Sequence, residues 1–428
     1  MMSTSLIPAT AEAADLNSSL LHLAGSPCRH FSRAEGQAVR VSVYGSWEQL
    51  KKQVLSWEAI LANNRALSIF STPEWLGSWW KAFGANKQML GLGFSTEDNS
   101  LVGLALFYFD EVKNPLFGKL AFLRLVGDGS GDSDNLDLII QSGFEKACAQ
   151  ALVRWLGNQR DWDVCFLNTL PEHSLAATAL KHDLERARWT CVLERSPNSA
   201  ISLPASWPQY VDSVSPRFRP LVTRYPQRLV QRYQVRIYRC EHLDDLSRSL
   251  RILFSLHAKR WNSVNQPGSF GSSERRKFYF EMAKCFLNKG WLELWLLELN
   301  GVPAAAQYCF RYSDTVCVLQ EGFDPGFASD KAGYALRAAA LRHFIETGVK
   351  KYDFLGGLDP HKQNWGAKPG SYLNLQFARP GSLGSLYLRY TNAMTRSKEW
   401  LRGNLPAPAW NILHWIKLHL AEAESSSV

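Results

Sequence analysis

The sequence predicts a mixed α/β fold in which two similar halves follow one another along the chain. Short apolar runs typical of strands alternate with longer stretches in which apolar residues recur at helical spacing. In addition, SLVGLALFYF (100–109) and GVPAAAQYCF (301–310) are each followed by a strand, a loop and a helix. A short apolar strand then follows in each half, WDVCFLN (162–168) and KYDFLGG (351–357). The length of this repeat excludes a solenoid and indicates an internal duplication.

The length and composition of the chain allow two domains of ordinary size. It has 428 residues, of which 46% are hydrophobic and 20% charged, and its Gly and Pro contents are near average, which excludes collagen and low-complexity classes. We expect a disordered segment over 1–38, a first domain over 39–205, a second over 206–385, and a C-terminal helical extension and tail over 386–428. The net charge of +9 favours anionic partners such as phosphorylated cofactors, nucleic acid or anionic lipids.

In the first half, helical periodicity and strand-like runs alternate from about residue 74 onward. The turn Glu97–Ser100 joins two apolar runs and predicts a hairpin. The expected helices and strands are, in order, Glu74–Phe83 (helix), Gln88–Phe94, Leu101–Val112, Leu120–Val126 and Leu136–Ile140 (strands), Phe144–Leu156 (helix), Asp163–Asn168 (strand), Ser174–Ala187 (helix) and Thr190–Glu194 (strand).

The second half begins after a basic connector, Ser213–Arg239, which holds seven arginines and three prolines. This connector is either a solvated helix face or a surface that faces an anion. Asn300-Gly301 between apolar runs is a strong hairpin signal. The expected elements are the helices Leu243–Trp261, Ser273–Lys289 and Tyr334–Glu346 and the strands Trp291–Leu299, Val302–Tyr312, Thr315–Phe323 and Tyr352–Leu355.

The cysteines and the apolar segments limit which cellular compartment and which chemistry can be expected. Eight separated cysteines without a CxxC pair predict buried thiols in a reducing compartment, and the scattered His residues predict no metal site. Cys309 and Cys317 lie inside apolar strands, which argues against a cysteine nucleophile. No apolar run is long enough to span a bilayer, so we expect a cytoplasmic protein. Trp410–Leu420 predicts either a helix packed on the body or an interfacial helix at the inner membrane.

The most informative stretch is the loop between the strand that ends at Phe323 and the helix that begins near Tyr334. A Gly- and Ser-containing loop before a helix presents free backbone N–H groups and the positive end of the helix dipole, which suit a phosphate or pyrophosphate. Gly333 permits close approach of an anion, and Lys331 adds a cation. Alternatively, Ser329 or Asp330 serves simply as the N-cap of the helix.

Five segments in this order resemble a known family: FSTPEWLGSWWKAFG (70–84), HAKRW (257–261), NGVPAAAQYCF (300–310), EGFDPGFASDKAGYAL (321–336) and YDFLGGLDPHKQNWG (352–366). Together they resemble the CelD-type acetyltransferases of the GNAT superfamily, a cellulose and exopolysaccharide biosynthesis group. The pattern is similar, more distantly, to the Fem-type aminoacyl transferases, which carry two GNAT-like domains. The resemblance covers roughly residues 45 to 385 and implies two tandem GNAT-like domains with mixed central sheets.

The resemblance also implies a cofactor and its site. Acetyl-CoA or another acyl-CoA would place its pyrophosphate on the loop before the Tyr334 helix and its pantetheine arm along the strand Val316–Gly322, without a metal. An amine or hydroxyl acceptor would enter between the domains. The cofactor-binding residues carried over in this way are Ser329, Lys331, Ala332, Gly333 and Tyr334.

The loop at 357–365 both matches the family pattern and departs from it. Lys362 and Trp365 match, whereas Leu358 and His361 replace an acidic position and a tyrosine position. We expect Lys362 to contact an anion, because flanking Gly and Pro residues indicate a shaped loop. Trp365 and Trp261 are the other candidate substrate-binding residues, although packing explains Trp261 equally well.

GNAT chemistry needs a proton acceptor for the attacking group and N–H donors for the developing oxyanion. Three residues are candidates for the base: Glu321 at the acyl end of the strand, Asp353 on the short second strand, and His257 in the HAKRW helix. Each has a structural alternative. Glu321 and Asp353 can be hydrogen-bonded partners inside the fold, and His257 can pack against Trp261 one turn later.

The function that these observations predict is acyl transfer from acyl-CoA to an amine or hydroxyl acceptor in polysaccharide or cell-envelope biosynthesis. One alternative is a non-catalytic accessory protein of a cellulose or exopolysaccharide synthase system. Another is Fem-like aminoacyl transfer from charged tRNA, with the basic connector as a phosphate track. The expected partners are therefore an acyl-CoA and a small-molecule or saccharide acceptor. Peripheral association with the inner membrane or a synthase is also possible, and nucleic acid is the less favoured partner.

Overall fold

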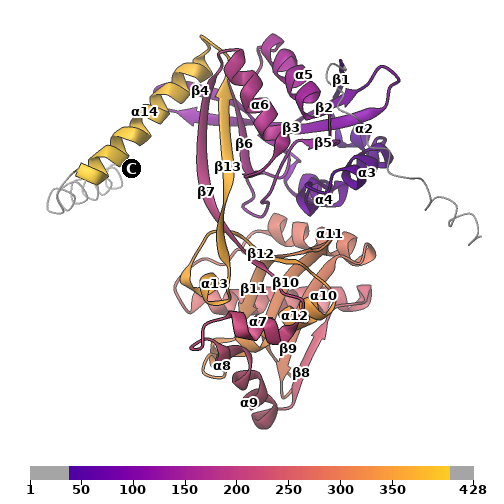
Figure 1. Cartoon of the computed structure of the whole chain (residues 1–428), viewed down its shortest axis with the longest axis vertical. Helices are drawn as coiled ribbons and strands as arrows, with labels where there is room; N and C mark the ends of the chain where they lie inside the picture. Colours follow the sequence, from indigo (N-terminus) through magenta and orange to yellow (C-terminus); the bar gives the residue numbers. More distant parts are fainter. Residues whose placement is uncertain (1–37, 405–428) are drawn as a thin grey trace, which may run out of the picture. The chain divides into compact units, whose positions relative to one another are not determined.

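The computed structural model describes residues 38–404. The expected disorder of the N-terminal segment and the Trp410–Leu420 helix lie outside the described residues. The described part is a mixed α/β structure built on one large sheet, which confirms the predicted fold class (Figure 1).

The first half consists of strands with helices packed around its part of the sheet. Its strands are β1 (Arg40–Tyr44), β2 (Gln88–Ser95), β3 (Leu101–Asn114), β4 (Gly118–Leu125), β5 (Ile139–Ile140), β6 (Val164–Pro171) and β7 (Thr190–Ser202). Its helices are α2 (Trp47–Lys51), α3 (Val54–Asn63), α4 (Pro73–Phe83), α5 (Glu145–Asn158) and α6 (Leu175–Arg186), with a 3-10 turn at Ile69–Ser71.

The second half repeats this plan. Its strands are β8 (Val235–Arg239), β9 (Leu292–Leu299), β10 (Val302–Tyr312), β11 (Thr315–Phe323), β12 (Lys351–Gly356) and β13 (Lys368–Ala378). Its helices are α7 (Trp207–Ser213), α8 (Arg219–Val222), α9 (Arg224–Arg232), α10 (Leu243–Asn262), α11 (Ser273–Asn288), α12 (Ala332–Glu346), α13 (Pro360–Asn364) and α14 (Leu383–Asn404), with a 3-10 turn at Pro325–Phe327.

The order of the strands shows the duplication directly. It runs β1-β2-β3-β4-β6-β13-β7-β12-β11-β10-β9-β8, and β5 pairs with β3 outside this path. The strands of the two halves follow one another in the same way when one half is followed inward from β1 and the other inward from β8. In this match β1 corresponds to β8, β4 to β11 and β6 to β12. In both halves an antiparallel meander ends in a parallel pair, β4 with β6 and β11 with β12. The crossover in each parallel pair contains a helix, α5 or α12, as such connections require.

The two halves exchange their last strands. The strand β13 of the second half lies between β6 and β7, while β7 of the first half continues onto β12, where Ile201 pairs with Tyr352. Figure 1 shows β7 and β13 running side by side from the elements of one half to those of the other. Because β13 and β7 pair with each other and with a strand of each half, the sheet is continuous from β1 to β8.

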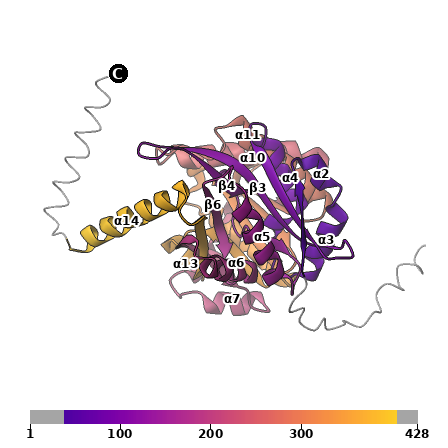
Figure 2. The ribbon, with the colours of Figure 1, turned by 90° about the horizontal axis from the view of Figure 1, so that it is seen from above.

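Large aromatic side chains join the helices of the two halves. Trp75 on α4 is fully buried and lies 5.4 Å from the ring of Phe278 on α11 and 5.4 Å from that of Phe310 on β10. Figure 2 shows the helices α10 and α11 on the same side of the molecule as α4. Burying rings of this size removes a large apolar area from water, which stabilises the contact between the halves.

The parallel pair β11 and β12 separates soon after it begins. The two strands are in register from Thr315 with Lys351 to Cys317 with Asp353, and the pairing stops there. Leu355 has a φ of 60°, in the left-handed region that a leucine rarely adopts, and this turns β12 away from its neighbour. The Leu355 N–H donates to Asp353 Oδ1 at 2.8 Å in place of a ladder bond. A wedge-shaped opening between the two strands follows.

Most predicted elements are confirmed within a few residues, including both hairpins. Two expectations were wrong in extent. The strand expected at Leu136–Ile140 is only Ile139–Ile140, because the preceding residues form a loop. The strand expected to end at Glu194 continues to Ser202, because it pairs with the second half. The basic connector contains the helices α8 and α9 and the strand β8.

The elements α13 and β13 were not predicted. The helix α14 begins at Leu383, close to the expected start of the C-terminal extension, whereas the boundary at 205/206 stays a prediction because β7 belongs to both halves.

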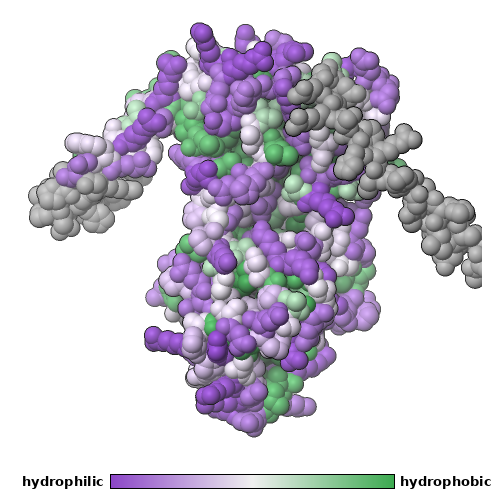
Figure 3. Space-filling view, in the orientation of Figure 1, coloured by the Kyte–Doolittle hydropathy of each residue, from purple (hydrophilic) through white to green (hydrophobic). Residues whose placement is uncertain are grey.

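Figure 3 shows a largely hydrophilic face with a hydrophobic area over the upper part of β7 and β13. None of the helices within residues 38–404 combines the length and the apolar character needed to cross a membrane.

Candidate functional site

The N-terminus of α12 presents backbone donors to a cavity. Lys331 is the N-cap with φ 59° and ψ 36°, and its side chain makes no capping bond. The first intrahelical bond is donated by the Ala335 N–H to the Lys331 carbonyl at 3.0 Å. Among residues 38–404, the N–H groups of Ala332, Gly333 and Tyr334 have no acceptor. Asp330 is not a cap, because its carboxylate bonds Arg232 at 2.5 Å and the Tyr233 hydroxyl at 3.1 Å.

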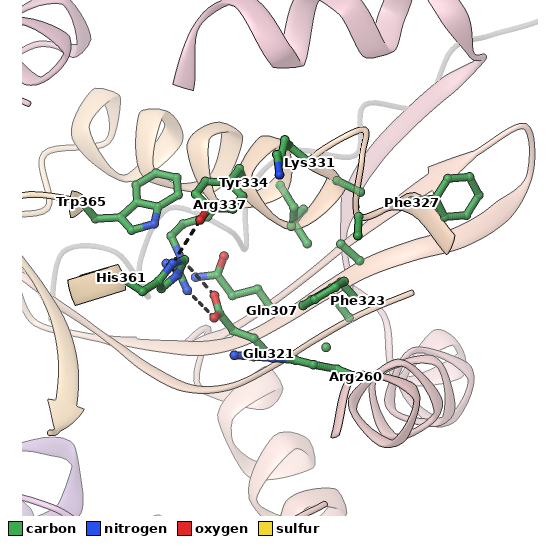
Figure 4. Close-up of a pocket in the computed structure, with 17 residues that line it drawn as sticks. Arg260, Gln307, Glu321, Phe323, Phe327, Lys331, Tyr334, Arg337, His361 and Trp365 are labelled. Carbon is green, nitrogen blue, oxygen red and sulfur yellow. Dashed lines mark hydrogen bonds and ion pairs between the residues drawn. The ribbon is translucent and has the colours of Figure 1, made fainter. Parts of the chain in front are cut away.

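The cavity beside this helix start is mainly apolar and has a volume of about 210 Å³. It extends from the loop before α12, along β11 and β10, to the ring of Trp365 (Figure 4). Two polar atoms in its wall lack a partner in the described structure, Gln307 Oε1 and Trp365 Nε1, although both side chains are at most 1% exposed. Unpaired buried polar atoms are costly, so their presence at a cavity indicates groups that a ligand satisfies.

A chain of polar side chains forms the inner end of this cavity. The Arg337 guanidinium on α12 holds the Glu321 carboxylate of β11 with two hydrogen bonds, one of them 3.0 Å from Nε to Oε1. Arg337 Nη1 also donates to Nε2 of His361 at 2.8 Å. Because arginine can only donate, His361 carries its own proton on Nδ1, which faces the Tyr334 hydroxyl at 3.3 Å. Figure 4 shows these side chains converging from α12, β11 and α13.

The electrostatic surroundings of these polar side chains leave none of them free to act as a base. Burial raises the pKa of Glu321, but the adjacent Arg337 outweighs it and holds the pKa below its ordinary value. Burial and the same guanidinium lower the pKa of His361 to about 4, so its ring is neutral at pH 7. Arg337 lies 4.9 Å from the ring of Trp365 and 5.1 Å from that of Phe354, which completes its desolvated surroundings.

A second cavity, of about 400 Å³, occupies the wedge between β11 and β12. It shares Arg260, Glu321, Arg337 and His361 with the first cavity, so the two adjoin. Its walls are more polar. They come from β11 (318–321), from β12 and α13 (354–362), and from the loop between β4 and β5 of the first half, which contributes Gly131, Asp132 and Asp134.

The first-half loop is fixed to the second half by several polar contacts. Asp132 accepts a hydrogen bond from the Tyr279 hydroxyl at 2.9 Å and pairs with Arg275 Nε at 3.1 Å. Arg275 also donates to the Ser130 carbonyl. Asp134 Oδ2 accepts the N–H of Gly356, which directly follows Leu355, at 3.0 Å. A segment more than two hundred residues away in sequence therefore forms a wall of the second-half cavity.

Two of the expected catalytic residues are part of the fold's interior. His257 is 1% exposed, its Nε2 accepts the Ser269 N–H at 3.0 Å, and its Nδ1 lies 3.0 Å from the Glu321 carbonyl oxygen. Burial lowers its pKa. Asp353 caps Leu355 and pairs with Lys351 at 2.7 Å. Neither residue lines either cavity, so these positions favour the structural alternatives that the sequence left open.

Glu321 does line both cavities, but as the partner of Arg337. The cofactor candidates Lys331, Ala332, Gly333 and Tyr334 are brought together at the first cavity, while Ser329 is exposed and lies outside its lining. Trp261 packs 5.9 Å from His257 and does not reach either cavity.

Lys362 and Trp365 lie at the cavities in different roles. The Lys362 ammonium donates to three backbone carbonyls, those of Phe354 (3.2 Å), Gly356 (2.5 Å) and Gly357 (3.3 Å), and it lines the second cavity. Burial lowers its pKa. With its donors in use, Lys362 stabilises the bend after β12, which weakens the expected anion contact. Trp365 is buried and stacks on Tyr334 with ring centres 5.8 Å apart.

Three residues that the sequence reasoning missed are Arg337, His361 and Asp134. Arg337 lies one turn after Tyr334 in a helix that is otherwise largely apolar. An arginine in such a position is rarely buried without a partner, so the sequence could have indicated it as a functional residue. His361 was noted only as a departure from a family pattern. Asp134 lies in a first-half loop, and the sequence alone did not indicate its contact with the second half.

The thiols and the acidic groups offer no other chemistry in this part of the chain. Cys309 and Cys317 are buried, and burial raises the pKa of both thiols well above the ordinary value, which makes them poor nucleophiles. Within residues 38–404, no group of three His, Cys, Asp or Glu side chains is arranged to hold a metal ion.

Comparison with known proteins agrees with this geometry. Residues 216–363, about a third of the chain, match the family model described as an acetyltransferase (GNAT) domain. The second half is therefore similar to GNAT acetyltransferase domains, a class of acyltransferase that takes acyl-CoA as co-substrate. In the described fold the first half repeats the plan of the second.

Comparison with solved structures gives matches at low sequence identity. The crystal structure of FemX is 10% identical with a TM-score of 0.54, over 78% of this chain and 96% of that chain. A tandem GNAT protein from the clavulanic acid biosynthesis pathway is 10% identical (TM-score 0.44, 80% of this chain and 99% of that one), and L-PGS from Bacillus licheniformis is 12% identical (TM-score 0.45, 78% and 96%). At this identity the FemX match shows the fold alone. No curated protein sequence gives a significant match.

Proposed function

We propose that this protein transfers an acyl group from acyl-CoA, bound in the second half, to an amine or hydroxyl acceptor. The observation that carries the proposal is the start of α12, where three consecutive backbone N–H groups without an acceptor open onto a cavity. Such a helix start binds a pyrophosphate through its amides and its dipole. No acidic residue lies in the first turn of α12, and Lys331 adds a positive charge.

The rest of the first cavity fits the remainder of the donor. Its wall along β11 and β10 is apolar, and it carries one buried carbonyl oxygen, Gln307 Oε1, without a partner. That oxygen can accept an amide N–H, which the pantetheine arm of coenzyme A contains. Beyond Cys317 the β11 backbone has no ladder partner on its β12 side, so peptide groups there are free to contact an inserted ligand.

The thioester is already activated, so the protein mainly holds the donor, excludes water and removes a proton. The Arg337 and Glu321 pair closes the inner end of the donor cavity and keeps the carboxylate ionised. The neighbouring second cavity adjoins this end and provides space for an acceptor. A saccharide acceptor of cell-envelope or polysaccharide biosynthesis rests on the sequence resemblance to the CelD type, and a cytoplasmic location rests on the sequence pattern alone.

Calorimetric titration with acetyl-CoA and longer acyl-CoAs tests the donor site. We expect one micromolar site per chain. Gly333→Glu, which puts a carboxylate where the pyrophosphate would lie, should weaken binding by at least about tenfold through charge repulsion. Gly333→Ala is the matched control. A Cβ at this position would lie 3.9 Å from the Phe323 side chain, and the backbone φ is not positive, so Ala fits and affinity should change little.

One observation favours a non-catalytic accessory protein as a second candidate, namely that Glu321 and His361 are both committed to Arg337. Failure to bind any thioester, with the protein folded, would support that candidate. Transfer RNA serves as a parallel ligand, because α9 carries Arg224, Arg228 and Arg232. Salt-sensitive tRNA binding without thioester binding would instead support Fem-like aminoacyl transfer.

A further inference from the structure

Two carboxylates at the second cavity, Asp134 and Asp359, each accept a single backbone N–H, and of these two only Asp134 is partly buried, whereas Asp359 is exposed. Glu321 is bound by Arg337, Asp132 is bound by Tyr279 and Arg275, and Asp359 accepts the Lys362 N–H at 2.9 Å as the N-cap of α13. Asp134 accepts only the Gly356 N–H, through Oδ2. Within residues 38–404, its Oδ1 has no hydrogen-bond partner.

The cations at the same cavity do not neutralise Asp134. Arg337 is paired with Glu321, and the Lys362 ammonium donates to three carbonyls of the bend after β12. Arg260 stacks over the rings of Trp261 and Phe323, on the side shared with the donor cavity. A partly buried carboxylate without an ion-pair partner attracts a cationic ligand group into the cavity that it lines.

We propose that the second cavity binds a primary amine as the acyl acceptor, and that Asp134, supplied by the first half, is the catalytic residue that takes up the proton of its ammonium group. This inference rests on the proposed acyl-CoA site. The acceptor would enter between the first-half loop and the separated ends of β11 and β12, where its nitrogen meets the inner end of the donor cavity.

The proton and bond changes balance as follows. The bound ammonium gives one proton to the Asp134 carboxylate, which leaves a neutral amine. Its lone pair forms the N–C bond at the thioester carbonyl as the C–S bond breaks. The second nitrogen proton leaves with the coenzyme A thiolate to give the thiol, and Asp134 then releases its proton to water.

The surroundings of Asp134 suit this task. The groups facing it are Asp132 on its own loop, Asp353 on β12, Lys362 on α13 and Tyr372 on β13. Burial is the main cause that raises the pKa of Asp134 to about 6, and Asp353 adds to it, while the Gly356 N–H and Lys362 act in the opposite direction. At neutral pH the group is therefore largely ionised, yet more basic than an exposed aspartate.

The test measures release of the coenzyme A thiol from acetyl-CoA by the full chain, with matched pairs of probes. Glucosamine is compared with glucose, and ethanolamine with ethylene glycol. We expect transfer to at least one amine and none to its hydroxyl partner. Asp134→Asn keeps the acceptor for the Gly356 N–H, and it should lower kcat by about a hundredfold or more and remove an acid limb of kcat near pH 6.

Calorimetry separates the failure of this proposal from the failure of the donor site. Asp134→Asn should bind acetyl-CoA within about twofold of the unchanged protein, and Asp161→Asn, an exposed first-half aspartate, should behave as wild type in every assay. Absent acetyl-CoA binding by wild type would refute the donor site. If acetyl-CoA binds, the amine assignment is overturned by transfer to hydroxyl probes only, by transfer to none of the amines, or by an active Asp134→Asn protein with an unchanged pH profile.

Discussion

The two halves of the sheet place equivalent elements in the same order, but they treat the space beside the parallel pair differently. In the first half, residues 126–144 between β4 and α5 fold back over that space. Asp128 there bonds Arg124 at 3.2 Å and Asn168 at 2.9 Å, so polar side chains of β4 and β6 are satisfied internally. In the second half, the loop 324–331 is short, β12 turns away at Leu355, and a cavity remains.

The N-termini of the two equivalent helices, α5 and α12, also differ in whether they can accept an anionic ligand. Glu145 lies in the first turn of α5 and accepts the Gly143 N–H at 2.9 Å, so this helix start already holds a negative charge. The first turn of α12 has no acidic residue and contains Gly333. Because the positive end of a helix binds one anion well, an internal carboxylate and a phosphate ligand exclude each other. The two halves therefore share one arrangement of strands and helices. They differ in the loop that precedes the helix and in the first turn of that helix, and these differences decide which half can accept an anionic ligand.

The largest expected effect concerns the buried ion pair under α12. Arg337→Met would leave the Glu321 carboxylate desolvated without its partner, and the free energy of unfolding should fall by about 3–5 kcal/mol. The first-half ion pair used for comparison is that of Arg124, whose partner Asp110 is 34% exposed and can be hydrated, while its other partner, the buried Asp128, keeps the hydrogen bond from Asn168. Arg124→Met should cost about 1–2 kcal/mol. Denaturant unfolding of both variants measures the difference.

A double variant separates the effect of the unpaired charge from an unrelated effect of altered packing. Adding Glu321→Gln to Arg337→Met removes the unpaired charge and should recover part of the lost stability. Equal losses for Arg337→Met and Arg124→Met, or no recovery in the double variant, would contradict the view that Glu321 depends on Arg337 to compensate its desolvation.

The next effect is on the pH dependence of stability and concerns the long first-half loop. Burial is the main cause that raises the pKa of Asp134 to about 6 and that of Asp137 to about 7, above the unfolded value near 4. The folded state therefore binds these protons more tightly. The resulting stabilisation is complete below about pH 4 and is lost as the pH rises through 6 and 7.

We therefore expect the free energy of unfolding to fall by about 1–2 kcal/mol between pH 5 and pH 8. Asp137→Asn should flatten this slope, and the paired carboxylate Glu321 should not contribute to it, because its lowered pKa affects stability only in acid. Urea titrations at four pH values would show the effect. Parallel curves for wild type and Asp137→Asn would mean that the loop is hydrated and does not bury these carboxyl groups.

The smallest effect is expected at the helix start of the first half. Glu145→Gln removes a favourable charge from the first turn of α5, which should cost at most about 0.5 kcal/mol. The number of acetyl-CoA molecules bound per chain, measured by calorimetry, should stay at one, because the loop 126–144 still fills the neighbouring space. A second bound molecule would show that the carboxylate alone had closed a latent site.

Much of the local structure could be read from the sequence. Helical periodicity located α5, α10 and α11 to within two residues, and Asn300-Gly301 correctly marked the turn between β9 and β10. The glycine-containing loop before α12 could be predicted as a candidate anion site because free amides at a helix start depend on local geometry alone. The strand β13 was missed because the alternation in its polar segment is weak and its partners lie far away in sequence.

The candidate catalytic residues show the limit of such reading. His257 and Asp353 have the right chemistry for a base, but only their contacts reveal that Ser269 and Lys351 already use them. Lys362 lies at the expected cavity, yet its donors face carbonyls of its own bend. Residue type and spacing identify groups able to do chemistry, whereas partners decide whether those groups are free to do it.

The sequence by itself determined the repeated strand and helix plan, the position of the glycine-containing turn before α12, and the burial of Cys309 and Cys317, because these depend on periodicity and on neighbours within a few residues; Cys191 and Cys285, also expected to be buried, are only partly so. Only the tertiary structure decided the exchange of β7 and β13, the separation of β11 from β12 at Leu355, and the meeting of Asp134 with Gly356. The strand exchange and the contact of Asp134 with Gly356 join residues more than a hundred positions apart, and β11 and β12 are themselves separated by the whole of α12. Backbone pairing and packing select such contacts across the whole fold, and no local pattern records them.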